Sequence, residues 1–138
     1  MEEPNRKQVY SVYRRMKSKK NENGKNLCCD AWLDDWNKFY TWYKNRFRKQ
    51  KQSCEYCHLP GDTIIHYGKH FRKEHRGINL EVDRKNPKGE YKPRNCVLAC
   101  YPCNNAKSDV FSHNEFLMIG EVIGRVKKQR AFQGDQEC

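Results

Sequence analysis

Long apolar segments are absent from this sequence. No uninterrupted apolar run is much longer than residues 97–101, whereas a transmembrane helix needs about 20 apolar residues in a row. The first residues also lack the apolar core of a secretory signal. We therefore expect a protein without a membrane partner, located in the cytoplasm of the cell that makes it.

Hydrophobic residues are scarce overall. They make up 36% of the 138 residues, against 33% charged residues, so the apolar core must be small. Small cores are often supplemented by a bound metal ion or by disulfides. The chain has eight cysteines, and disulfides are rare in a reducing cytoplasm. This combination favours metal binding.

Acidic residues are outnumbered by basic ones. The chain has 17 Asp and Glu against 28 Lys and Arg, which gives a formal net charge of +11. A balance this basic favours a polyanionic partner. Since a membrane surface is the weaker alternative, we expect DNA as the partner, with RNA as a further option.

The most regular pattern in the chain is a stripe of aromatic residues. Its members recur every three or four positions, as on one helix face: Trp32, Trp36, Phe39, Tyr40, Tyr43 and Phe47. We predict one helix here, with Asp30 as its N-cap. The stripe favours packing in the core. Stacking on nucleic-acid bases and docking of a protein partner are the alternatives.

Two more helices are predicted at the ends of the chain. Residues 4–20 form a basic helix with apolar residues at helical spacing. Near the other end, Ser112 and Glu115 make the S-x-x-E pattern of a capping box, which opens a C-terminal helix. We divide the chain into a helical extension (1–50), a central module with the C-terminal helix (51–130) and a disordered tail (131–138).

Two C-x-x-C pairs carry the strongest chemical signal. Each pair, Cys54–Cys57 and Cys100–Cys103, can present two sulfurs to one ion, and Zn²⁺ accepts four thiolates in a tetrahedron. The sequence therefore predicts one structural zinc site. His58 follows Cys57 directly, and we expect it near the site or at the surface. The remaining cysteines are expected as buried or free thiols, with a shift of register to Cys96 as an alternative: Cys28, Cys29, Cys96 and Cys138.

The segment between the two pairs has a recognisable order of elements. Residues 80–83 alternate as a short strand does, a turn-rich loop follows, residues 97–99 form a second strand, and a helix begins near Cys103. This order, with the motifs V-D, Y-x-x-x-N and C-x-x-C-N-x-x-K, resembles the HNH (ββα-metal) nuclease superfamily in its four-cysteine zinc branch. The resemblance covers residues 54–109.

The resemblance implies a fold class and a catalytic site. The fold would be α+β, a small ββα-metal module with flanking helices. Asp83 and Asn104 would hold one divalent catalytic ion, Mg²⁺ or Mn²⁺, and Asn95 would be the central loop asparagine. A carboxylate with an amide oxygen leaves most positions of such an ion open to water and phosphate. Arg94 and Lys107 are natural phosphate contacts.

One position departs from the family pattern. Arg84 stands where the family usually has the histidine that activates water, and a guanidinium is a poor general base. Arg84 could instead hold a phosphate or stabilise the transition state. We consider three explanations: a base from elsewhere, hydroxide formed from metal-bound water, or a site that only binds. His75 is the first candidate base, and the other candidates are His70, His66 and Tyr91.

These residues lead to one functional hypothesis and its rivals. The first is a metal-dependent endonuclease that hydrolyses phosphodiester bonds in DNA. Basic residues of the first helix and of the segment 69–76, the latter through Lys69, Arg72 and Arg76, would bind the DNA backbone. The alternatives are a non-catalytic zinc-stabilised nucleic-acid-binding module and an accessory subunit of a nuclease or defence complex. Asp83 with Asn104 favours the enzyme, whereas Arg84 favours the alternatives.

Overall fold

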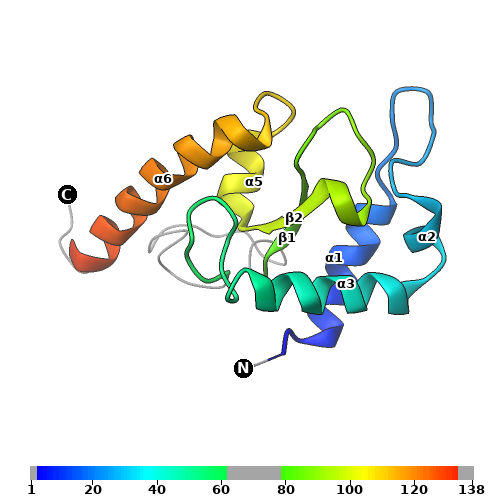
Figure 1. Cartoon of the computed structure of the whole chain (residues 1–138), viewed down its shortest axis with the longest axis horizontal. Coiled ribbons are helices and arrows are strands. Elements are labelled where there is room, and N and C mark those ends of the chain that lie inside the picture. The colour runs from blue at the N-terminus through cyan, green and yellow to red at the C-terminus, as the bar shows by residue number, and fades with distance from the viewer. Residues whose placement is uncertain (1–2, 62–78, 134–138) are drawn as a thin grey trace.

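The structure is a computed structural model that describes residues 3–61 and 79–133. It is an α+β fold with a two-stranded sheet at its centre, as predicted. Figure 1 shows the sheet between the pair α1–α3 and the pair α5–α6. The elements in chain order are α1 (Arg6–Lys17), α2 (Asp30–Leu33), α3 (Trp36–Lys49), β1 (Glu81–Arg84), η1 (Pro93–Asn95), β2 (Cys96–Ala99), α5 (Tyr101–Lys107) and α6 (His113–Gln133).

The two strands form an antiparallel hairpin with a defined register. Glu81 pairs with Ala99 and Asp83 pairs with Val97. β2 is buried along its whole length, so its residues read as a continuous apolar run rather than an alternating one. The hairpin leads directly into α5, and this gives the strand–loop–strand–helix order that the sequence predicted.

The aromatic stripe lies on two helices, not one. The chain leaves helical geometry at Asp34 and restarts at Trp36, because Asp35 caps the new helix by accepting a hydrogen bond from the Lys38 amide. Asp30 is therefore not the N-cap that we predicted, and Cys29 occupies that position of α2. An additional cap breaks a helix even where the apolar spacing continues.

The prediction that the aromatic stripe packs in the core is confirmed. Trp32, Phe39 and Tyr43 are almost fully buried, and the rings of Trp32 and Phe39 meet edge to face at 5.2 Å. Tyr13 of α1 joins them, and its hydroxyl donates to the Trp32 carbonyl at 2.6 Å. Other residues of the protein thus cover the rings of Trp32, Phe39 and Tyr43. These three rings are therefore available neither for stacking on bases nor for docking a protein partner.

The N-terminal helix is shorter than predicted. α1 covers Arg6–Lys17 and is capped by Asn5, whose side chain accepts from the Gln8 amide. Its buried residues pack against α3 and β1. One core cluster contains residues from Val9 to Phe116, so residues of both predicted segments share it.

The predicted capping box opens α6. Glu115 Oε1 accepts from the Ser112 amide at 2.9 Å, and Ser112 Oγ accepts from the Glu115 amide at 3.2 Å. The helix continues to Gln133, beyond residue 130 where we expected it to end. Among the helices of the described residues, none has the length and apolarity needed to cross a membrane.

Candidate functional site

The two C-x-x-C pairs meet at one point. Cys54 and Cys57 lie in the turn after α3, Cys100 follows β2 as the N-cap of α5, and Cys103 lies in the first turn of α5. All four residues are buried, and their ligand atoms lie within 4.8 Å of one another. The four-cysteine cluster predicted from the spacing is confirmed.

The cluster has the spacing of a tetrahedral metal site. Zn–S bonds of ~2.3 Å place tetrahedral sulfurs ~3.8 Å apart, and the sulfurs of Cys57 and Cys100 are 3.8 Å apart. Burial raises the pKa of the Cys54 thiol. Thiolates in such a place need a cation beside them, so the donor set fits a zinc ion.

Other cysteines and His58 lie outside this cluster. Cys96 is fully buried, and burial raises the pKa of its thiol to about 12, as expected for an inert core thiol. Cys96 therefore does not shift the ligand register. His58 is exposed, and its left-handed backbone (φ 62°) closes the turn around Cys54. Cys138, which we expected as a free thiol, is outside the described residues.

A second group of polar residues lies where β1 meets α5. Glu81 and Asp83 are one pleat apart on β1, and both are buried. Asn104 and Lys107 are about one turn apart on α5 and face them. Asn104 Nδ2 donates to Glu81 Oε2 at 3.2 Å, and Lys107 Nζ lies 3.4 Å from the Asp83 carboxylate. The predicted ligands Asp83 and Asn104 thus belong to the same strand–helix interface.

The environment of Asp83 is dominated by hydrogen-bond donors. The Tyr56 hydroxyl donates to Asp83 Oδ2, and Lys107 faces the same carboxylate. Burial raises the pKa of Asp83, while the Tyr56 hydrogen bond and the Lys107 charge act in the opposite direction. Burial also raises the pKa of Tyr56, so this hydroxyl remains a donor that orients the carboxylate.

A small cavity opens beside the same interface. It has a volume of about 180 Å³ and lies between α1, β1 and α5. Arg15, Lys19, Glu81, Asn104 and Ser108 are among its lining residues, and Arg15 Nη2 donates to Glu81 Oε1 at 3.3 Å. Asp83 does not line it. Glu81 is therefore the carboxylate of β1 that this cavity reaches.

Arg84 and Asn95 both form hydrogen bonds with the backbone of the loop between the strands. Arg84 donates to the Gly89 carbonyl at 3.0 Å, and its guanidinium lies 4.8 Å from the centre of the Tyr91 ring. Asn95 holds the same loop, because its amide nitrogen donates to the Asn86 and Glu90 carbonyls. Both residues fix the shape of the loop between the strands.

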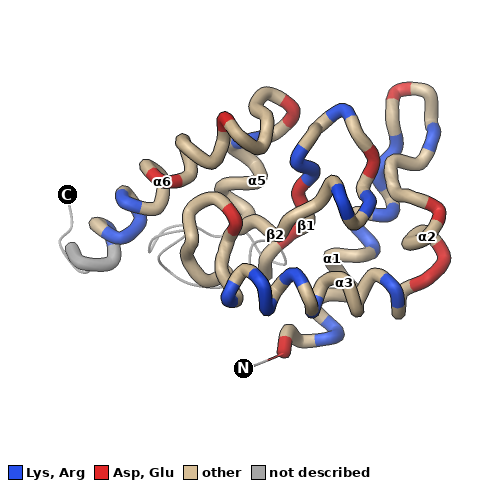
Figure 2. Tube along the Cα trace, viewed as in Figure 1, with Lys and Arg blue, Asp and Glu red and all other residues tan. Residues whose placement is uncertain are grey.

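The basic residues predicted to contact phosphate differ in their exposure. Arg94 is exposed. Lys107 is wholly buried, and its ammonium donates to the Arg84 carbonyl at 2.7 Å, so it is not the surface phosphate contact that we expected. Figure 2 shows basic residues along α1 and the C-terminal part of α3. Six predicted contacts or bases lie outside the described residues: Lys69, Arg72, Arg76, His66, His70 and His75.

Sequence reasoning missed four residues of this site. The sequence indicates Glu81 only as a strand position, Tyr56 only as a spacer between cysteines, and Arg15 only as one of the basic residues of the first helix. His113 was not considered, although its ring lies 5.8 Å from the ring of Tyr56 and its Nε2 lies 3.2 Å from Glu55 Oε1. The alternation of Glu81 with Asp83 is the one local signal that could have identified Glu81, since it places both on one face.

Comparison with known proteins gives one informative result. No family model and no curated protein sequence matches the chain. A solved structure, described as the rare-cutting HNH restriction endonuclease PacI in a study of its DNA perturbation, matches with a TM-score of 0.66 and 25% sequence identity. The match covers 88% of this chain and 80% of that chain. The resemblance to the HNH endonuclease fold with a four-cysteine cluster is confirmed.

Proposed function

We propose that the protein is a metal-dependent HNH-type endonuclease that hydrolyses phosphodiester bonds in DNA. The observation that carries the proposal is the polar interface between β1 and α5, where Asn104 contacts Glu81 and Lys107 contacts Asp83, within a fold shared with an HNH restriction endonuclease. The net charge of +11 supports a polyanionic substrate.

A divalent ion fits the oxygen donors of this interface. Because the Asn104 amide nitrogen donates to Glu81, the amide oxygen is directed away from Glu81 and can serve as a ligand. Carboxylate and amide oxygens are the donors that Mg²⁺ and Mn²⁺ prefer. Such an ion supplies charge stabilisation for the attacking and leaving oxygens of a phosphodiester.

The protein's own residues orient these donors. Tyr56 and Lys107 hold the Asp83 carboxylate from two sides, and Glu81 holds Asn104. Arg15 and Lys19 line the cavity and supply positive charge for a phosphate, and Arg94 supplies a further exposed contact. The general base is not assigned by these contacts, and His75 remains a prediction.

We also propose that the cysteine cluster holds one structural Zn²⁺. The cluster joins the turn after α3 to the end of β2 and the start of α5. It thereby stabilises the position of α5, which carries Asn104, against β1. Elemental analysis of the purified protein should give about one zinc per chain.

A nicking assay tests the catalytic proposal. Supercoiled plasmid is incubated with Mg²⁺ or Mn²⁺ and with the wild-type protein, Asn104→Ala or the control Asn114→Ala, an exposed residue of α6. We expect nicking by the wild type and the control, and at least a 100-fold loss in Asn104→Ala with DNA binding retained, the order of magnitude for a catalytic electrostatic contact. Equal nicking by all three proteins would contradict the assignment of Asn104.

Two observations favour a non-catalytic alternative. Asp83 is already engaged by Tyr56 and Lys107, and Arg84 replaces the usual histidine. A zinc-stabilised nucleic-acid-binding module, or an accessory subunit, would show DNA retention without nicking by any of the three proteins. The same assay, with binding measured in parallel on DNA and on RNA, distinguishes this outcome.

A further inference from the structure

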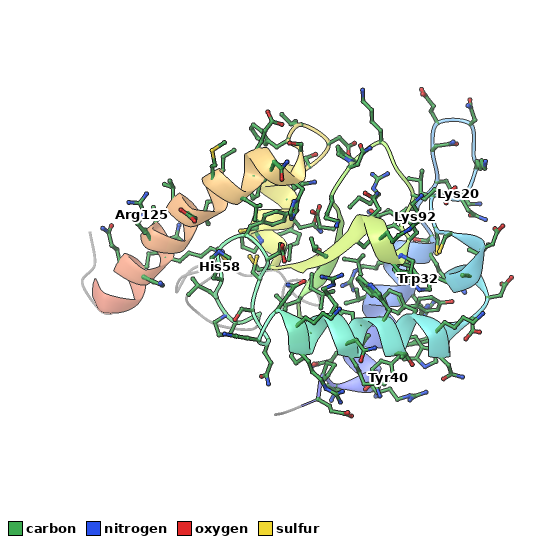
Figure 3. All side chains as sticks on the ribbon, viewed as in Figure 1. Lys20, Trp32, Tyr40, His58, Lys92 and Arg125 are labelled. Atoms are coloured by element: carbon green, nitrogen blue, oxygen red, sulfur yellow. The ribbon has the colours of Figure 1, made fainter. Side chains whose placement is uncertain are left out.

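A lysine of the C-terminal helix reaches the cysteine cluster. Lys127 is only 2% exposed, and its Nζ lies 3.3 Å from Cys100 Sγ and 3.6 Å from Cys57 Sγ. Arg125, two positions earlier on α6, is exposed and points outward (Figure 3). The ammonium of Lys127 is thus turned toward sulfur instead of solvent.

Two glycines bring α6 close enough for this contact. A Cβ at Gly120 would lie 2.5 Å from the Tyr56 carbonyl oxygen, and a Cβ at Gly124 would lie 2.7 Å from the Cys57 carbonyl oxygen. The helix therefore rests on the backbone of the first C-x-x-C turn. This close approach carries Lys127, about one turn after Gly124, to the sulfurs.

The charges of the two groups are complementary. A divalent ion with four thiolates leaves about two net negative charges, and burying such charge is costly without a compensating group. A buried ammonium has the same requirement with the opposite sign. N–H···S bonds from a charged donor lower the electron density on the sulfurs, and hydrogen bonds to sulfur tune the properties of metal–thiolate sites.

We propose that Lys127 is a positioning residue of the metal centre, whose ammonium donates to Cys57 and Cys100, offsets the negative charge of the loaded cluster and holds α6 over it. This inference rests on the proposed zinc occupancy and is independent of the proposed nuclease activity. It makes α6 part of the metal site, although this helix contributes no ligand.

Zinc binding by the full chain tests the proposal. Zinc affinity is measured by competition with a chromophoric chelator for the wild type, Lys127→Met, Lys127→Gln and the control Lys128→Met, which alters the exposed neighbour on the same helix. We expect Lys127→Met to bind zinc about 10- to 100-fold more weakly. Lys127→Gln keeps an N–H donor without the charge, so its zinc affinity should lie between those of the wild type and Lys127→Met. The zinc affinity of Lys128→Met should match that of the wild type.

A spectroscopic measurement separates this role from a general loss of stability. In the Co²⁺-substituted protein, removing a charged donor raises the energy of the sulfur electrons. The sulfur-to-cobalt charge-transfer bands of Lys127→Met and Lys127→Gln should therefore move to lower energy, and those of Lys128→Met should not. Should Lys127→Met fail to fold, the affinity and spectrum of Lys127→Gln decide.

The outcomes distinguish the two proposals. A wild-type protein without zinc would overturn the zinc site, and the role of Lys127 with it. A wild-type protein with one zinc, beside Lys127 variants of unchanged affinity and unchanged Co²⁺ spectrum, would overturn the role of Lys127 alone. Nuclease activity does not enter either comparison.

Discussion

The ammonium of Lys107 lies 3.4 Å from the carboxylate of Asp83, and both side chains are buried. The two residues connect α5 to β1 at the interface that also contains Asn104 and Glu81. A phosphate cannot use a lysine in this position without displacing it from Asp83. Lys107 therefore holds the Asp83 carboxylate in place, and its main contribution is to the stability of the fold.

Replacing Lys107 should destabilise the protein strongly. Lys107→Met removes the charged partner of the buried Asp83 carboxylate, and breaking a buried ion pair from one side costs about 3–5 kcal/mol. The measurement is the free energy of unfolding from urea titration of the zinc-loaded protein. The control is Lys88→Met in the exposed loop. A loss no larger than that of the control would show that Asp83 does not depend on Lys107.

Gly120→Ala should destabilise the protein, against the usual trend for helices. Alanine in a helix interior is normally favoured over glycine by about 1 kcal/mol. At this position the added Cβ would lie 2.5 Å from the Tyr56 carbonyl oxygen, and the resulting overpacking costs about 1–3 kcal/mol. Glu121→Ala at the exposed neighbour is the control. Thermal melting of both variants gives the sign of the change in stability. An increase in Tm for Gly120→Ala would refute the close contact.

Glu81 should control the affinity of the divalent site. The Asn104 amide donates to Glu81, so Glu81→Leu leaves the amide orientation undetermined and removes a negative charge beside the ion. We expect Mn²⁺ to bind about 10-fold more weakly, as for outer partners of metal ligands. Titration calorimetry with Mn²⁺ measures this, and Glu90→Leu in the exposed loop is the matched control. Unchanged affinity would remove Glu81 from the site.

The capping box should make stability depend on pH. The hydrogen bond from the Ser112 amide lowers the pKa of Glu115 below its ordinary value. Because the folded pKa is depressed, Glu115 stabilises the fold above its unfolded pKa of about 4.3. This contribution is lost as pH falls from there through the folded pKa.

Comparing Glu115→Gln with the wild type isolates this contribution. We expect the stability difference between them to shrink on acidification from about pH 5 to pH 3. Urea unfolding at a series of pH values measures it, and Glu121→Gln on the same helix corrects for general effects of charge. A difference that grows toward low pH would mean that the Glu115 pKa is not depressed.

Patterns confined to short stretches of sequence were sufficient to predict several features of the structure. The spacing of Cys54 and Cys57, and of Cys100 and Cys103, predicted the cluster because a C-x-x-C turn presents both sulfurs to one side. Ser112 with Glu115 predicted the start of α6 in the same local way. The aromatic spacing predicted a buried face, although the added cap at Asp35 divided the helix in two.

Other features were decided by the tertiary structure. Glu81 and Arg15 are distant in sequence, and they meet only because α1 packs on β1. Lys107 appeared as an exposed helical cation in the sequence, and the packing of α5 against β1 buried it. Lys127 is far along the chain from Cys57, and no local pattern connects them.

The physical reason for this division lies in the range of the interactions. Turn geometry, capping and helical periodicity act over a few residues, so the amino-acid sequence by itself determined which cysteines form the cluster, where α6 begins and which faces are apolar. Burial of a charge depends on which elements pack together. The tertiary structure alone therefore decided that Lys107 faces Asp83, that Asn104 faces Glu81 and that Lys127 faces sulfur.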